Sequence, residues 1–109
     1  MAEMSKREIW NFLMRGTLTG KLATVKQDGT SHVVPVWFIV EKHGNHRQND
    51  IVFSTNMASV KAKNIIRDKR VSICVDDQTP PFSFVTIDGI AKIQKYLQND
   101  LFKWTSKIA

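Results

Sequence analysis

The chain is 109 residues long, with 42% apolar and 24% charged residues, which fits one globular domain with a modest core. It has no apolar run near the roughly 20 residues that span a bilayer, and its first residues lack the apolar core of a signal peptide. Cys74 is the single cysteine, which excludes an internal disulfide and a cysteine-based metal cluster. We therefore expect a cytoplasmic protein without a membrane segment.

The formal net charge of +6 suggests an anionic partner, because a basic surface attracts phosphates without specific contacts. The 16 lysines and arginines are nevertheless spread along the chain without a run of four. Such a distribution is typical of a solvated surface. The charge therefore supports an anionic small ligand better than it supports a nucleic acid.

The first predicted element is a short amphipathic helix over residues 6–15. Ser5 and Glu8 have the spacing of a capping box, in which each side chain bonds the backbone of the other residue. Apolar residues then recur on one helical face, and Gly16 can adopt the left-handed conformation that ends a helix. The sequence thus predicts both ends of this helix.

A β-hairpin is predicted next, with strands over residues 18–25 and 32–40 joined by a turn at Asp28–Gly29. Pro35 interrupts the second strand, because proline cannot donate a backbone hydrogen bond to a neighbouring strand. We expect Pro35 at a sheet edge, at a bulge or where a ligand replaces the neighbouring strand. The polar residues 41–50 are predicted to form a loop.

The second half of the chain alternates short strands with helices. We predict a strand over residues 51–55, a helix over 59–67, a strand over 71–76, a turn over 77–81 and a long strand over 83–95 with a bulge or bend at Gly89. Asn99 can cap a final helix that carries Leu101, Phe102, Trp104 and Ile108. About five short strands of this kind favour a small, mostly-β antiparallel barrel with helices at its ends. Without a visible linker or repeat, we expect one domain over residues 1–109.

The most informative segment is Phe53–Asn64, in which an apolar strand end leads through hydroxyl side chains into a helix start. The first backbone N–H groups of a helix lack partners within the helix and attract anions, and Lys61 and Lys63 would add formal charge. The apolar segment Val33–Phe38, broken by its proline, could line a flat aromatic ligand. Together the two segments suggest a phosphorylated aromatic cofactor.

Several segments, in this order and spacing, resemble one known family: Gly20–Thr24, Asp28–Gly29, His32–Phe38, Phe53–Thr55, Ser59–Asn64, Arg70–Ser72 and Pro80–Phe82. The chain resembles the FMN-binding split β-barrel proteins that are like pyridoxamine 5'-phosphate oxidase, in the branch that includes deazaflavin-dependent members. The resemblance implies a split antiparallel β-barrel. It also implies a homodimer that binds FMN, or in some relatives an 8-hydroxy-5-deazaflavin, at the interface.

The resemblance also assigns site residues. Against the isoalloxazine ring, largely through backbone groups, it places Val34, Pro35, Val36, Trp37 and Phe38. Around the phosphate it places Ser54, Thr55, Ser59 and Lys61. Asn64 lies on nearly the same helical face as Lys61 and is included in the site. Two interpretations of Trp37 stay open, a core aromatic and a wall of the cofactor site. Lys63 could simply be solvated.

Three departures from the family pattern accompany the resemblance. Val60 stands where many relatives have an arginine beside the lysine, so phosphate binding should be weaker. Phe84 stands where the vitamin-B6-oxidising members place a glutamine from the second subunit. Relatives continue beyond Ala109 through an arginine-tyrosine segment and a final strand, so we expect a barrel truncated at the C-terminus and a substrate other than vitamin B6 phosphate.

The leading functional hypothesis is an FMN-binding oxidoreductase that transfers hydride between flavin and a small organic substrate at a dimer interface. No catalytic side chain is assigned, because the flavin itself carries hydride chemistry. The alternatives are a deazaflavin-dependent reductase, a non-catalytic flavin-binding or storage module, and a basic barrel for single-stranded nucleic acid. His43 and His46 lie in a polar segment without regularly spaced ligands, so we predict no metal site.

Overall fold

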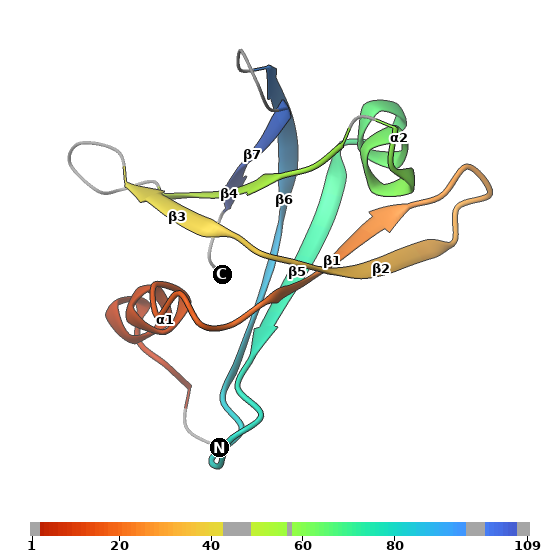
Figure 1. Cartoon of the computed structure of the whole chain (residues 1–109). Coiled ribbons are helices and arrows are strands. Elements are labelled where there is room, and N and C mark those ends of the chain that lie inside the picture. The colour runs from red at the N-terminus through yellow and green to blue at the C-terminus, as the bar shows by residue number, and fades with distance from the viewer. Residues whose placement is uncertain (1–2, 43–48, 57, 96–99, 107–109) are drawn as a thin grey trace.

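The computed structural model of the chain describes residues 3–42, 49–56, 58–95 and 100–106. Seven strands form one sheet in the order β2-β1-β5-β6-β7-β4-β3, and every neighbouring pair is antiparallel (Figure 1). The elements are α1 (Lys6–Leu13), β1 (Gly20–Val25), β2 (Ser31–Val36), β3 (Ile39–Lys42), β4 (Asn49–Ser54), α2 (Val60–Arg67), β5 (Arg70–Asp76), β6 (Phe84–Lys95) and β7 (Asp100–Ser106). The mostly-β split-barrel prediction is confirmed.

Local hydrogen bonds explain where α1 begins. The Ser5 side chain accepts from the backbone N–H of Glu8 at 3.2 Å, and the Glu8 carboxylate accepts from the backbone N–H of Ser5 at 3.1 Å. This is the predicted capping box, which satisfies two backbone donors. The helix ends at Leu13, two residues earlier than predicted, and Gly16 follows with a φ of 75°.

The predicted hairpin is present between β1 and β2. The backbone N–H of Lys26 donates to the carbonyl of Thr30 at 2.8 Å, and Gly29 has a φ of 86°, which glycine adopts without strain. The Asp28 carboxylate accepts from both the backbone N–H and the hydroxyl of Thr30. These contacts fix the turn and hence the register of the two strands.

The predicted strand over residues 32–40 is wrong in one respect, because it is two strands. β2 ends at Val36, β3 begins at Ile39, and the two lie at opposite ends of the sheet order. Figure 1 shows them as one run of chain that crosses from one half of the barrel to the other. The chain changes its pairing partner at Trp37–Phe38, from β1 to β4. Pro35 lies in β2, a terminal strand of the order, which confirms the edge prediction.

The predicted final helix is wrong, because Asp100–Ser106 form strand β7. β7 pairs with β6 on one side and β4 on the other, so it joins the two halves of the sheet. Backbone pairing on both sides outweighs a local helical pattern. The predicted cap Asn99 and the last residue of that helix, Ile108, lie outside the described residues.

Of the bulge or bend predicted at Gly89, the bulge is absent, since the register between β5 and β6 runs without an offset from Arg70↔Ile90 through Val71↔Gly89 to Asp76↔Phe84. The predicted loop over 41–50 is shorter than expected, because β3 extends to Lys42 and β4 begins at Asn49.

The core lies on one face of the curved sheet. Residues in β1 alternate between buried and partly exposed positions, as expected for a strand with one face in the core. Both helices contribute to this core, with Phe12 and Leu13 from α1 and Ala62 and Ile65 from α2. Gly20 packs so closely that a Cβ atom there would collide with the Ile73 side chain.

The opposite face of β2, β1, β5 and β6 is exposed or half-buried, and we call it the outward face. It includes Val33, Pro35, Lys21, Cys74, Asp76, Phe84 and Ile90, which alternate with core residues along their strands. In the part of the chain that the structure describes, no helix has the length and apolar character needed to cross a membrane.

Candidate cofactor-binding site

The N-terminus of α2 presents a group of hydrogen-bond donors. The hydroxyls of Thr55 and Ser59 lie 3.1 Å apart, and the Ser59 hydroxyl caps the helix by accepting from the backbone N–H of Ala62 at 3.2 Å. Within the described residues, nothing accepts from the backbone N–H groups of Val60 and Lys61. Free N–H groups at a helix N-terminus, with hydroxyls beside them, favour a bound anion.

Two lysines add positive charge to this end of α2. Lys61 is half-buried and Lys63 is exposed. Neither side-chain ammonium group forms a hydrogen bond or an ion pair with any residue that the structure describes. We call Thr55, Ser59, Lys61 and the two free backbone N–H groups the anion site.

The strand register brings the predicted aromatic-ligand segment to the same end of the sheet. Ile39 of β3 is the partner of Val52 of β4, and the two strands are antiparallel. The paired register ends at Ile39 and Val52, so Trp37–Phe38 and Ser54 both lie at this end of the strand pair. Ser54 is exposed at the end of β4, immediately before Thr55. From this end of the strand pair the chain leads back to Trp37–Phe38 on one strand and forward to Thr55 of the anion site on the other.

Side chains of the segment 34–38, which we call the ring wall, face in different directions. Val36 is buried in the core, Val34 and Phe38 pack partly against it, and Pro35 is exposed. Trp37 is 69% exposed, so the interpretation of this residue as a core aromatic is wrong. Only Pro35 and Trp37 in the ring wall offer an exposed side chain, and Val36 can face a ligand only through its backbone.

A family comparison now adds to this geometry. The sequence model described as pyridoxamine 5'-phosphate oxidase matches residues 7–106 of the chain. The chain belongs to the pyridoxamine 5'-phosphate oxidase family. A search of the curated proteins finds no significant match. The match covers both helices, all seven strands, the anion site and the ring wall.

Solved structures share this fold. A conserved hypothetical protein from Mycobacterium tuberculosis is 32% identical with a TM-score of 0.70, and the alignment covers 88% of this chain and 57% of that protein. An F420 reductase is 20% identical with a TM-score of 0.74, over 98% and 96% of the two chains. A heme storage protein from Vibrio cholerae is 17% identical with a TM-score of 0.69, over 95% and 91%. The last two show a common fold alone.

Asn64, a predicted site residue, lies apart from the anion site. Its side chain is 5% exposed and donates to the hydroxyl of Thr24 on β1 at 3.1 Å, while its carbonyl oxygen accepts from the guanidinium of Arg67 at 2.9 Å. Arg67 also donates to the backbone carbonyl of Val25 at 2.6 Å. These bonds attach α2 to β1 and occupy the polar atoms of the Asn64 side chain.

Val60 and Phe84, the departures from the family pattern, are both exposed. Val60 is the first residue of α2 and lies next to Lys61, so an apolar side chain stands at the anion site. The nearest arginine on this helix, Arg67, is directed to β1 by the bonds described above. In this family member, Lys61 is therefore the charged side chain of the anion site.

Sequence reasoning missed a second group of charged residues, at the other end of β1. Lys21 pairs with Asp76 at 2.5 Å and Arg15 pairs with Asp77 at 2.7 Å. The bond from Lys21 lowers the pKa of the Asp76 carboxyl. A bond from the backbone of Thr79, followed by the bond from Arg15, lowers the pKa of the Asp77 carboxyl. Each partner is distant in the sequence, so no local pattern indicates these pairs.

Proposed function

We propose that this chain is a flavin-binding oxidoreductase of its family, with FMN as the cofactor and residues 1–109 as one flavin-binding domain. The observation that carries the proposal is the anion site, where two free backbone N–H groups, two hydroxyls and Lys61 meet. When bound, the flavin supplies hydride chemistry toward a small organic substrate. The donors present fit the dianionic phosphate that distinguishes FMN from riboflavin.

In this proposal the residues of the anion site make different interactions with the phosphate. The neighbouring Ser54 hydroxyl and one of the mutually bonded hydroxyls of Thr55 and Ser59 donate hydrogen bonds to phosphate oxygens, and the Lys61 ammonium neutralises charge. Asn64 contributes indirectly, because its bonds to Thr24 and Arg67 fix the position of α2. Fixed donors lose little freedom when the ligand binds, which improves affinity.

The ring wall would hold the isoalloxazine. Backbone groups of Val34, Val36 and Phe38 can bond its polar edge, while the exposed side chains of Pro35 and Trp37 cover its apolar surface and exclude water. The pairing of β3 with β4 supports this part of the proposal, because the chain leads from one end of this strand pair to the ring wall and to the start of α2.

We also propose that the protein is a cytoplasmic homodimer. Val33 and Ile90 are large apolar residues on the outward face, and each is more than half exposed. Apolar groups gathered on one sheet face are typical of a protein interface. Light scattering coupled to size exclusion tests this proposal, and a monomer at micromolar concentration would contradict it.

The test of the cofactor is a titration of the purified chain with FMN, with riboflavin and with an 8-hydroxy-5-deazaflavin, followed by visible absorption. Saturable binding of FMN at least about tenfold tighter than of riboflavin supports the proposal, since the two ligands differ only in the phosphate. Tighter binding of the deazaflavin would instead favour a deazaflavin-dependent reductase, the activity named for one structural neighbour.

A second measurement separates an enzyme from a storage module. The bound flavin is reduced chemically without oxygen, and its reoxidation by small organic acceptors is followed. Reoxidation that saturates with acceptor concentration supports an oxidoreductase. Cofactor binding without saturable turnover for any acceptor would favour the flavin-storage alternative.

A further inference from the structure

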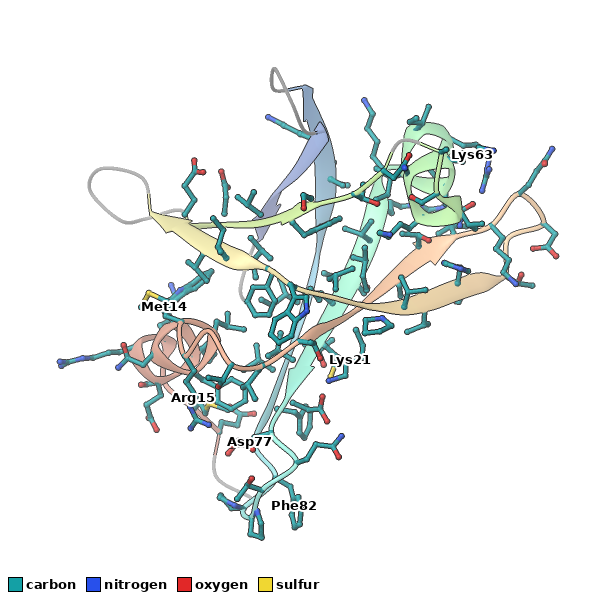
Figure 2. The ribbon with its side chains drawn as sticks, viewed as in Figure 1. Met14, Arg15, Lys21, Lys63, Asp77 and Phe82 are labelled. Atoms are coloured by element: carbon teal, nitrogen blue, oxygen red, sulfur yellow. The ribbon has the colours of Figure 1, made fainter. Side chains whose placement is uncertain are left out.

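A surface hollow of about 610 Å³ lies at the end of the outward face, where β5 turns into β6. Residues from three strands and the turn line it, among them Lys21, Cys74, Asp76, Gln78, Phe82 and Phe84. None of these belongs to the anion site or to the ring wall. Figure 2 shows Phe82 and Lys63 at opposite ends of the molecule, so the hollow is separate from the N-terminus of α2.

Two phenylalanines give the hollow aromatic walls. Phe82 is 59% exposed and Phe84 is 54% exposed, although rings of this size are usually buried. Phe82 also has a φ of 61°, in the left-handed region that bulky residues rarely adopt. A bond from its backbone N–H to the carbonyl of Thr79, at 2.9 Å, accompanies this conformation. A large ring exposed from a strained backbone position is a feature of ligand sites.

On the polar side of the hollow, Lys21 is a hydrogen-bond donor whose charge is balanced by a neighbouring carboxylate. Lys21 donates to Asp76 at 2.5 Å and, through a long contact of 3.5 Å, to the carbonyl of Thr19. An ammonium group has three donors, so one remains for a ligand. Asp76 cancels the charge of Lys21, as Arg15 cancels the charge of Asp77. A charged ligand would lose its hydration here without gaining a net opposite charge.

The hollow borders the ring wall through the sheet register. Lys21 is the cross-strand partner of Pro35 on one side and of Cys74 on the other. Side chains of such partners lie about 5 Å apart on the same face of a sheet. A ligand bonded to Lys21 would therefore lie next to Pro35, the residue that is proposed to contact the flavin ring.

We propose that the hollow is the substrate site of the proposed flavin enzyme and that it takes a flat, uncharged aromatic compound carrying a carbonyl oxygen. The rings of Phe82 and Phe84 contact the aromatic part of this compound, and the Lys21 ammonium donates to the carbonyl. The role of the compound as substrate rests on the proposed function. Its binding requires no flavin, so the two proposals can be tested separately.

Acridone is a suitable probe, because it is flat, uncharged and fluorescent and carries one carbonyl. We expect saturable binding to the flavin-free full-length chain. Since Cys74 lines the hollow and is the single cysteine, bound acridone should also slow its labelling by N-ethylmaleimide, measured by mass spectrometry. The double variant Phe82→Ala/Phe84→Ala should bind acridone at least about tenfold more weakly, because both aromatic contacts are lost.

Variants of matched charge test the donor. Lys21→Met should weaken acridone binding severalfold, whereas Lys63→Met, a change of the same kind on α2, should leave it unchanged. Thermal unfolding and light scattering verify that each variant keeps the fold and the assembly state of the parent. If the double alanine variant does not fold, Phe82→Leu and the protection of Cys74 in the parent chain provide the test.

Each outcome decides the inference. The inference would be overturned if the double alanine variant bound acridone as tightly as the parent, or if bound acridone left Cys74 labelling unchanged. Displacement of acridone by FMN would also overturn it, because one pocket would then receive both rings. Acridone binding with the expected variant pattern, in a chain that fails to bind FMN, would support the hollow as a ligand site and refute the proposed flavin function.

Discussion

The two ends of the barrel differ in whether their positively charged side chains have carboxylate partners. At the N-terminus of α2, Lys61 and Lys63 have no carboxylate partner among the described residues. At the hollow, Lys21 and Arg15 are each paired with an aspartate, and Figure 2 shows Arg15 and Asp77 close together. The unpaired positive charge behind the net charge of +6 is therefore not distributed evenly over the surface. In our proposals, one end binds the phosphate of the cofactor and the other binds an uncharged compound.

The paired charges at the hollow have a geometric role more than an energetic one. Their side chains are 20–49% exposed, and ion pairs at such positions contribute little to stability. They do connect segments that are distant in the sequence, since 62 residues separate Arg15 from Asp77 and 55 separate Lys21 from Asp76. The turn between β5 and β6 is thus held against β1 and the segment after α1.

The largest expected effect comes from breaking the anion site. Lys61→Met should weaken FMN binding about tenfold to a hundredfold, because a hydrogen bond to a charged group contributes about 1.5–3 kcal/mol. Riboflavin binding should change less than about twofold, since riboflavin carries no phosphate. Both affinities come from absorption titrations. Lys63→Met is the matched control and should behave as the parent; equal losses for both flavins would remove Lys61 from the phosphate.

A second prediction distinguishes the N-terminus of α2, where the anion site lies, from Asn64, which attaches the helix to β1. Asn64→Ala should lower the free energy of unfolding by about 1–3 kcal/mol, because the buried Thr24 hydroxyl loses its partner. Chemical denaturation measures this change. The folded variant should keep FMN affinity within about threefold, well inside the range expected for an indirect contact.

The double variant Thr24→Val/Asn64→Leu serves as its control. It should be less destabilised than the sum of the single changes Thr24→Val and Asn64→Leu, because neither residue then leaves a polar group unpaired. A loss of FMN affinity above tenfold in folded Asn64→Ala would instead support the direct contact that the sequence predicts.

Salt provides a third comparison of the two ends. FMN affinity should fall severalfold between about 0.05 and 0.5 M salt, because screening weakens attraction between exposed charges. Acridone affinity should change less than about twofold, since neither the probe nor the hollow has net charge. Parallel titrations of one preparation measure both. A strong salt dependence of acridone binding would mean that the ion pairs of the hollow open to admit the ligand.

Features that depend on neighbours a few residues away could be predicted from the sequence. The caps at Ser5 and Ser59 and the hairpin turn at Asp28–Gly29 each close through bonds that span two to five residues, so their signals are contained in short segments. The alternation of apolar residues in β1 and β5 likewise predicts which face is buried. These local elements were sufficient to indicate a small antiparallel barrel.

Features that depend on distant partners could not be predicted in this way. β7 is a strand because β4 and β6 lie on either side of it, and its own residues favour a helix as readily. The interruption between β2 and β3 at Trp37–Phe38 exists because β3 pairs with β4 while β2 pairs with β1. The hollow requires Lys21, Asp76 and Phe84 to meet from three strands. For the same reason, the side chain of Asn64 could not be assigned to Thr24 from its helical position alone.

The smallest expected effect concerns Asp68, which follows the C-terminus of α2 and pairs with Arg70. Its carboxylate accepts two bonds from the Arg70 guanidinium and one from the Arg70 backbone, which lower its pKa from 3.8 to about 2. A carboxyl with a lowered pKa stabilises the fold above its ordinary pKa and loses this contribution as the pH falls. Asp68→Asn should therefore be less stable than the parent at pH 7.

The difference in thermal stability between parent and Asp68→Asn should be constant above about pH 5 and vanish as the pH approaches 2. Asp28→Asn is the control, because Asp28 bonds only the uncharged groups of Thr30, and its effect should resist salt while that of Asp68 does not. A difference that grows on acidification would contradict the assignment.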